Sequence, residues 1–233
     1  EDSFNKKEIR KGTKLFPKTF KNISFNKVYY KYLGANNYTF KNFSAVIKAN
    51  QINAIIGDSG IGKTTLIDML PLLIEPTKGQ ITIDNLDTKL ININSLRNSF
   101  AYVDQKPFFF KGSIIDNLSY CQTTLNINSC IKAAKLAKAD SFIKKLPGDY
   151  QYLLGESGAG LSGGQLQRLE IAKALATERK IIILDEPTSN LDDKNSKELL
   201  STLININRKT KATIIVISHK SDVIKISKNL IKL

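Results

Sequence analysis

Cysteine and histidine are scarce in this chain of 233 residues, which has two cysteines and one histidine. Cys121 and Cys130 match neither the spacing of a metal-binding cysteine pair nor the framework of a disulfide-stabilised domain. We therefore expect no cysteine-ligated metal and no disulfide scaffold. Buried or idle thiols in a reducing cytosol are the simplest interpretation of the two cysteines.

Long hydrophobic runs are also missing. The longest candidates, residues 181–184 and 212–217, are interrupted by charged or polar residues within one strand length, so neither is long enough to cross a bilayer. The sequence begins at Glu1 and lacks the charged, apolar and small-residue series of a signal peptide. We interpret it as a piece of a longer protein, in which any membrane role involves a partner or a part outside this sequence.

Acidic residues are outnumbered, with 21 Asp and Glu against 35 Lys and Arg, which gives a net charge of +14. Such an excess attracts nucleic acids or anionic lipid headgroups. The lysines are scattered, however, and no segment combines clustered bases with the interleaved aromatics of a nucleic-acid surface. We therefore expect no nucleic-acid partner, although the charge alone leaves that alternative open.

The length and a hydrophobic content of 42% indicate one large globular domain with room for a subdomain. Residues 1–21 are basic, lack periodicity and contain Pro17, which is typical of a linker. Strand patterns follow from Ile23, at 40–47, at 52–56 and at 81–83, and they predict a small antiparallel sheet beside the core. The region 94–160 is predicted to be helical, with one apolar face formed by Cys130, Ala133, Ala134 and Ala137.

Two apolar runs, 181–184 and 213–217, are separated by a segment with helical spacing. Continuous apolar strands of this kind are buried on both faces of a parallel sheet, and strand, helix and strand in succession predict a βαβ unit. The core is therefore predicted to be of the α/β class.

A phosphate-binding loop is predicted directly after the apolar run 52–56, where the sequence satisfies G-x-x-x-x-G-K-[ST]. It comprises Gly57, Asp58, Ser59, Gly60, Ile61, Gly62, Lys63, Thr64 and Thr65. The glycines let the backbone bend so that its N–H groups face an anion, and the next residues supply a helix N-terminus. Lys63 would contact the β- and γ-phosphates and Thr64 would bind Mg²⁺. The alternative is a glycine-rich turn that binds nothing.

Two carboxylates, Asp185 and Glu186, end the apolar run 181–184. Ligands of open α/β sheets bind at the carboxyl ends of the strands, and successive strand residues point to opposite sides. Asp185 is therefore predicted to face Mg²⁺ while Glu186 orients a water that attacks the γ-phosphate. The alternative is an acidic turn that merely ends a strand.

A second candidate anion site lies at Ser162, Gly163, Gly164 and Gln165, which open a run with Leu166, Leu169, Ala172 and Leu175 on one predicted helix face. By itself this is compatible with an ordinary helix start with Ser162 as N-cap. As a binding site, the exposed N–H groups and the Ser162 hydroxyl suit a phosphate.

The series LSGGQ between a phosphate loop and ILDEP resembles the nucleotide-binding domain of ATP-binding cassette (ABC) transporters over residues 22–233. The resemblance implies a P-loop NTPase core with a mostly parallel sheet, an N-terminal antiparallel β subdomain and a helical subdomain at about 94–170. Residues 1–21 would then be a basic linker from a missing transmembrane domain.

The resemblance also assigns roles to single residues. Gln105 resembles the glutamine that contacts Mg²⁺ and the γ-phosphate, His219 the histidine that contacts the γ-phosphate, and Tyr32 the aromatic residue that stacks on adenine. A lone histidine is more often structural, and Tyr32 is also compatible with a cross-strand tyrosine. Residues 155–158 and 108–114 are similar to segments of ABC exporters. Leu166 departs from the family pattern, where a basic residue is common.

The implied function is ATP binding and hydrolysis by two copies that enclose ATP and Mg²⁺, coupled to transport by a membrane domain on the cytoplasmic face of the inner membrane. Glu186, His219 and Gln105 would be catalytic. The sequence leaves open an importer subunit, a soluble ABC protein that acts on nucleic acid or ribosomes, and a cassette that binds without hydrolysing.

Overall fold

The computed structural model describes residues 12–120, 126–189 and 191–233. Its centre is a parallel sheet in the order β11-β3-β10-β9-β6. These strands are β3 (Ile52–Ile56), β6 (Phe100–Val103), β9 (Ile181–Asp185), β10 (Thr213–Ser218) and β11 (Asn229–Lys232). The predicted βαβ unit is confirmed, because α7 (Asp193–Thr210) connects β9 to its parallel neighbour β10.

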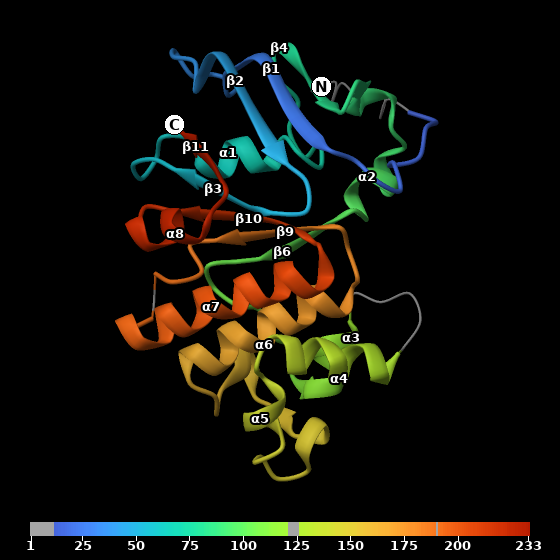
Figure 1. The fold of residues 1–233 in the computed structure, drawn as a ribbon, viewed down its shortest axis with the longest axis vertical. Helices are drawn as coiled ribbons and strands as arrows, with labels where there is room; N and C mark the ends of the chain where they lie inside the picture. Colours follow the sequence, from blue (N-terminus) through green and yellow to red (C-terminus); the bar gives the residue numbers. More distant parts are fainter. Residues whose placement is uncertain (1–11, 121–125, 190) are drawn as a thin grey trace, which may run out of the picture.

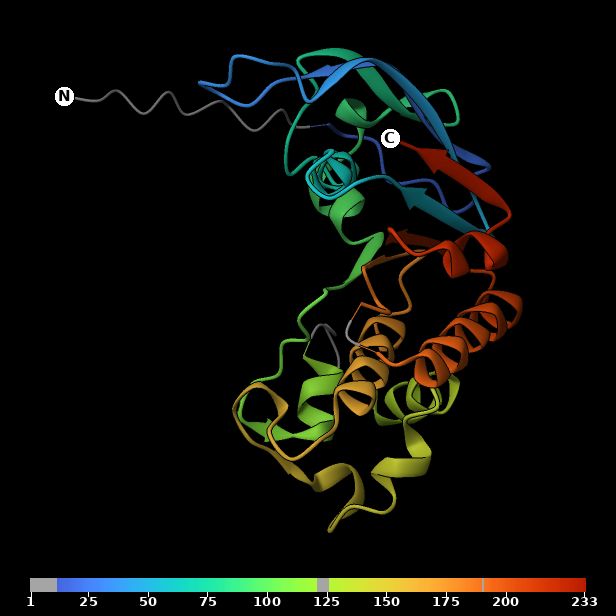
Figure 2. The same ribbon diagram turned by 90° about the vertical axis from the view of Figure 1, so that its left-hand side faces the viewer.

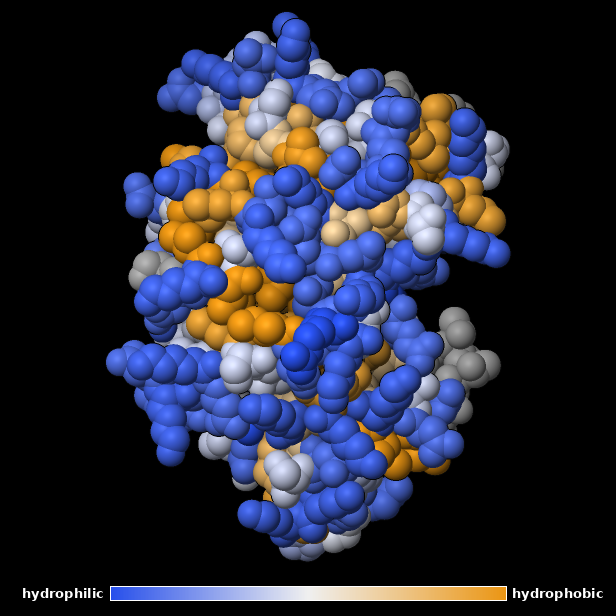
Figure 3. Space-filling model, viewed as in Figure 1, coloured by the Kyte–Doolittle hydropathy of each residue, from blue (hydrophilic) through white to orange (hydrophobic). Residues whose placement is uncertain are grey.

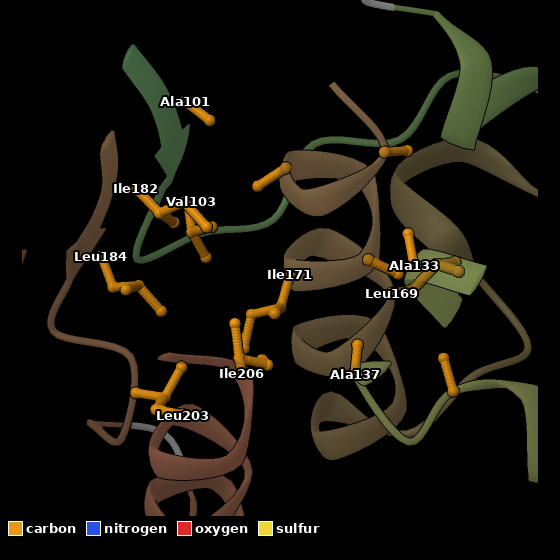
Figure 4. Close-up of a cluster of buried hydrophobic side chains, with 14 of the residues drawn as sticks. Ala101, Val103, Ala133, Ala137, Leu169, Ile171, Ile182, Leu184, Leu203 and Ile206 are labelled. Carbon is orange, nitrogen blue, oxygen red and sulfur yellow. The ribbon is translucent and has the colours of Figure 1, made fainter. Parts of the chain in front are cut away.

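The strands are buried on both faces because their side chains alternate between two hydrophobic cores. Ile181 and Ile183 belong to the core that contains Leu66 of α1 (Lys63–Asp68). Ile182 and Leu184 belong to the opposite core, where they face α6 (Gly163–Ala176) and α7. Figure 4 shows Ile182, Leu184 and Val103 of the sheet directed toward Ile171 of α6 and Leu203 and Ile206 of α7.

A second, antiparallel sheet covers the α1 side in the order β2-β1-β4-β5. Its strands are β1 (Asn22–Tyr30), β2 (Phe40–Lys48), β4 (Lys78–Ile83) and β5 (Leu86–Asp87). Ile23, Phe25 and Ile81 face the same core as Leu66. The predicted antiparallel subdomain is thus confirmed, and α1 lies between the two sheets (Figure 2).

The lower lobe in Figures 1 and 2 is helical. It contains α3 (Ile114–Ser119), α4 (Ile127–Leu136), α5 (Asp140–Ile143) and α6, with the short pair β7 (Gly112–Ser113) and β8 (Leu153–Leu154). Short helices η1 (Thr88–Leu90), α2 (Ile93–Arg97), η2 (Asp149–Gln151), η3 (Glu156–Gly158) and α8 (Ser221–Ile226) complete the described elements. The predicted apolar face is confirmed, since Cys130, Ala133, Ala134 and Ala137 are all buried.

Two predictions about this region were wrong. The helical assignment of 94–160 fails at β6, which pairs with β9 as an edge of the parallel sheet. A short apolar run carries no periodicity that separates a strand from a buried helix. The predicted apolar face of α6 was also narrower than the buried surface of this helix, because Glu170, Ile171 and Ala174 are buried as well. This helix packs against α4, α3 and β6, so little of its circumference faces solvent.

The described part of the predicted linker, residues 12–21, packs on the domain. Phe16 and Phe20 are buried, and the Phe16 ring meets those of Phe20 and Phe100 edge to face at 5.6 and 6.4 Å. The backbone of Lys14 is hydrogen-bonded to residues 90 and 92. These contacts add aromatic area to the upper core, so residues 12–21 are part of the folded unit.

Hydrophilic side chains cover most of the face in Figure 3, and hydrophobic side chains gather around α8 and β11. In the described ranges, no helix has the length and apolar character that a membrane crossing needs. Cys121 lies outside the described residues, and Cys130 is buried.

Replacing Phe16 with Ala is expected to lower the free energy of unfolding by roughly 3 kcal/mol, because a large buried ring is removed from a packed core. The neighbouring Leu15 is 74% exposed, so Leu15→Ala is the matched control and is expected to change stability by less than about 0.5 kcal/mol. Urea denaturation of both variants measures the difference. Equal, small effects would mean that residues 12–21 do not contribute to the fold.

Candidate functional site

The predicted phosphate loop lies between the end of β3 and the start of α1. Gly60 and Gly62 have φ of +79° and +110°, and a Cβ at Gly62 would lie 2.7 Å from Cγ2 of Thr39. Only glycine fits that combination of backbone angle and close approach. The loop curves around the buried Lys63, whose Nζ donates hydrogen bonds to the carbonyls of Gly57 at 2.8 Å and Asp58 at 2.9 Å.

Tyr32 lies beside this loop. Its hydroxyl is 2.7 Å from Oγ1 of Thr65, and its ring meets that of Tyr30 edge to face at 4.9 Å. Tyr29 instead packs on Tyr38. Tyr32 is 47% exposed, so its ring has free surface next to α1. Of the three neighbouring tyrosines, the structure places the predicted one against the helix that follows the phosphate loop.

Asp185 ends β9 next to β10, at the same edge of the sheet as the phosphate loop. Burial raises the pKa of Asp185, and the carboxylates of Glu186 and Asp104 raise it further, while Lys63 lowers it. Several carboxylates therefore lie close together around Asp185, in surroundings that are partly shielded from water. Such an environment disfavours a bare carboxylate and favours one that is paired with a cation.

Glu186 follows in a left-handed backbone conformation, with φ of +45°, and its N–H donates to the carbonyl of Ile217 at 3.0 Å. Non-glycine residues adopt this conformation at a cost in backbone strain. Glu186 Oε1 is 3.0 Å from Nδ1 of His219, and Ser218 Oγ donates to Oε2 at 3.5 Å. The His219 side chain is 58% exposed and that of Glu186 is 13% exposed. The residues after β9 and β10 thus form a carboxylate–imidazole pair.

Gln105 follows β6 and reaches the segment after β9, where its Nε2 donates to Ser189 Oγ at 3.3 Å. Gln105 is exposed at the same edge of the sheet. Side chains that follow the ends of β3, β6, β9 and β10 are therefore gathered along one edge.

The predicted metal ligands, Thr64, Gln105 and Asp185, offer hydroxyl, amide and carboxylate oxygens, which are the donors that Mg²⁺ prefers. Within the described ranges, no group of three or more His, Cys, Asp or Glu residues could hold a metal ion. This donor set fits Mg²⁺ that takes its remaining ligands from phosphate oxygens and water, the usual mode for this cation.

Ser162 and Gln165 form a capping box at the start of α6. Ser162 N–H donates to Gln165 Oε1 at 2.9 Å, and Gln165 N–H donates to Ser162 Oγ at 3.4 Å. A Cβ at Gly163 would meet nothing within 4 Å, so the fold of this chain does not require glycine there. Because α1 and α6 pack on opposite faces of the parallel sheet (Figure 1), this segment is not brought to the phosphate loop of its own chain.

The sequence analysis did not identify an ion pair in α6, between Glu170 and Lys173, that contacts the segment after Gln105. Lys173 of α6 forms an ion pair with the buried Glu170 at 2.8 Å, donates to the carbonyl of Phe108 at 2.9 Å and lies 5.1 Å from the ring centre of Phe109. The pair ties α6 to the segment after Gln105. A charged residue between Leu169 and Ile171 was the available sign that this part of the helix is buried with a partner.

A family model described as ABC transporter matches residues 40–189. The "ABC transporter B family member 13" of Arabidopsis thaliana is 39% identical over 87% of this chain and 16% of its own length. The "Alpha-hemolysin translocation ATP-binding protein HlyB" of Escherichia coli O157:H7 is 34% identical over 96% of this chain and 31% of its own.

A solved structure is also similar. "Structure of a bacterial Atm1-family ABC exporter with ATP bound" superposes with a TM-score of 0.84 and 30% identity, over 94% of this chain and 38% of that one. The chain spans between 16% and 38% of the length of these three proteins.

We expect Asp185→Asn to increase the free energy of unfolding at pH 7 without bound nucleotide. A raised pKa means that the ionised carboxylate is less favourable in the folded than in the unfolded chain, so ionisation costs stability. That cost disappears below the ordinary pKa of 3.8, where the group is protonated in both states. The gain should therefore shrink as the pH falls toward 3.8. Denaturation curves across this range test the sign, and a loss of stability at pH 7 would contradict it.

Proposed function

The chain belongs to the ABC transporter family, and from that premise we propose that it binds and hydrolyses ATP to drive export across a membrane. The observation that carries the proposal is the gathering of Lys63, Asp185, Glu186 and His219 at the ends of three adjacent strands. A phosphate-binding lysine, a metal-binding carboxylate and a carboxylate that orients water are the parts that phosphoryl transfer needs. The resemblance to exporters supports the direction of transport.

ATP binding begins at the phosphate loop. Lys63 exchanges its bonds to the carbonyls of Gly57 and Asp58 for the β- and γ-phosphates, and the backbone of residues 57–65 surrounds them. Tyr32 stacks on the adenine with the free surface of its ring. Because stacking accepts any planar base, this contact adds affinity more than base selectivity.

Thr64, Asp185 and Gln105 are the residues that would hold Mg²⁺. When bound, Mg²⁺ neutralises charge on the phosphate oxygens. Asp185 is suited to this role because its carboxylate lies among other carboxylates and is partly buried. A cation next to it relieves that unfavourable ionisation.

Glu186 is the proposed group that orients the water and accepts its proton as the water oxygen attacks the γ-phosphorus. The bond from this phosphorus to the bridging oxygen breaks, and ADP leaves with that oxygen. The Oε1 of Glu186 is 3.0 Å from the His219 ring, and this contact fixes the direction of the carboxylate. His219 then contacts the γ-phosphate. Gln105 couples the presence or absence of the γ-phosphate to the position of the segment 108–114.

Two copies are proposed to enclose the nucleotides. Ser162 and Gly163 are exposed at the start of α6, and a Cβ at Gly163 would meet open space. Helix α6 lies on the other face of the sheet from α1, which follows the phosphate loop. We infer that its N–H groups and the Ser162 hydroxyl complete the phosphate site of a second copy. ATP binding then closes the pair and hydrolysis reopens it.

The membrane part is proposed to be a transmembrane domain that contacts the helical lobe, with this chain on the cytoplasmic face of the inner membrane. An importer subunit remains the runner-up. A soluble ABC protein that acts on nucleic acid rests on the net charge alone.

The role of Glu186 is tested by Glu186→Gln, which keeps the size and hydrogen bonding of the side chain but removes its charge. Hydrolysis is expected to fall by roughly 10²–10³-fold, as for loss of a general base. ATP affinity should be retained, and a dimer that persists with MgATP should appear in light scattering, whereas the nucleotide-free chain is monomeric at low concentration.

Lys63→Ala is the comparison variant and should lose nucleotide binding and the dimer together. Fluorescent-nucleotide titration and phosphate release measured on both variants separate the two roles. Near-parental hydrolysis in Glu186→Gln, or loss of its ATP binding, would show that Glu186 does not have the proposed role.

A further inference from the structure

A cavity of about 820 Å³ lies at the amino ends of β9 and β10, the edge of the sheet opposite the phosphate loop. Its walls are residues 18–20, one face of α4, the turn after α6 and the C-terminal end of α7. Figure 1 shows the ends of α6 and α7 together on the right, below the N-terminal segment. Since a strand of six residues spans about 20 Å, this cavity is separate from the nucleotide site.

The lining is strongly basic. Seven residues carry positive charge and one carries negative charge: Lys18, Lys132, Lys135, Arg179, Lys180, Lys209 and Lys211, with Glu178. In the described part of the chain, none of the seven cations forms an ion pair. Glu178 is instead hydrogen-bonded to the Ser129 hydroxyl.

Helix termini account for part of this charge. Basic residues near a C-terminus offset the helix dipole, which equals about half an elementary charge, and two of the seven, Lys135 of α4 and Lys209 of α7, lie in the last turn of their helices. Together with Glu178, these two termini offset roughly two of the seven charges. The Asp140 carboxylate further offsets Lys135, which leaves roughly four positive charges without a nearby negative charge in the described residues.

Two of the cations have structural contacts as well. Arg179 donates to the carbonyl of Phe100 at 2.6 Å, and Lys180 donates to those of Pro17 at 2.6 Å and Lys18 at 2.7 Å. Burial lowers the pKa of Lys180, and the charge of Lys18 lowers it further. Lys18 and Lys180 thus already repel each other at this cavity, and a bound anion would relieve that repulsion.

We propose that this cavity binds a small multivalent phosphate anion. Lysine ammonium groups bind phosphate as point charges, and the volume lies within the range of small-molecule sites. Thr19, Thr210, Asn50 and Asn205 add hydroxyl and amide groups to the lining. The occupant connects residues 18–20 to α4 and α7, so it stabilises the docked state of the N-terminal segment.

The test is calorimetric titration of the 233-residue chain with tripolyphosphate, without Mg²⁺. Every sample carries Lys63→Ala, so that the phosphate loop does not contribute. The test pair Lys132→Gln and Lys209→Gln removes two exposed charges from the cavity. The control pair Lys41→Gln and Lys145→Gln removes two exposed lysines from elsewhere. Glutamine is a good helix former, and thermal denaturation checks that both double variants remain folded.

Tripolyphosphate is expected to bind the Lys63→Ala chain at one site. The test pair should weaken that binding roughly tenfold, or about 1.4 kcal/mol, while the control pair changes it less than about twofold. No binding, or equal weakening by both pairs, would overturn the proposal, because attraction would then follow net charge alone. A single-stranded RNA that binds more tightly than tripolyphosphate through Lys132 and Lys209 would also overturn it in favour of a nucleic-acid site.

Discussion

The burial of one parallel sheet on both faces is the constraint on which the rest of the molecule depends. Ile181 and Ile183 pack toward α1, while Ile182 and Leu184 pack toward α6 and α7. Every strand of this sheet runs the same way, so every strand ends at the same edge. Polar residues that follow the strands, such as Asp185 and His219, are brought together there without being close in sequence.

The same sheet separates two surfaces of different chemistry. The carboxyl edge carries the phosphate loop and a concentration of carboxylates around Asp185. The amino edge collects helix C-termini and the lysines of the basic cavity. The position of two of these termini follows from the chain connections, since α6 and α7 lead directly into the amino ends of β9 and β10. The charges that make up the net +14 are therefore distributed unevenly, with basic residues gathered at the amino edge and carboxylates at the carboxyl edge.

The N-terminal segment and α6 show how packing changed the meaning of local patterns. Residues 12–21 are basic and contain Pro17, which is typical of a linker, yet Phe16 and Phe20 are buried, and Phe16 packs on Phe100. In α6, Glu170 is buried because Lys173 neutralises it beside Phe108. The contact of Phe16 with Phe100 joins residues far apart in the chain. The burial of Glu170 depends on what covers that face of α6, although its partner Lys173 lies only three residues away.

The sequence by itself determined the phosphate loop, the apolar strands and the carboxylates after β9, because glycine placement and continuous apolar runs restrict the local backbone strongly. It also predicted the antiparallel subdomain. Only the tertiary structure decided that residues 100–103 are an edge strand, that Tyr32 rather than Tyr29 lies on α1, and that Glu186 contacts His219. It alone assembled the basic cavity from five separate segments. These features are long-range contacts, and their geometry is set by how the sheet and helices pack rather than by the preferences of any single segment.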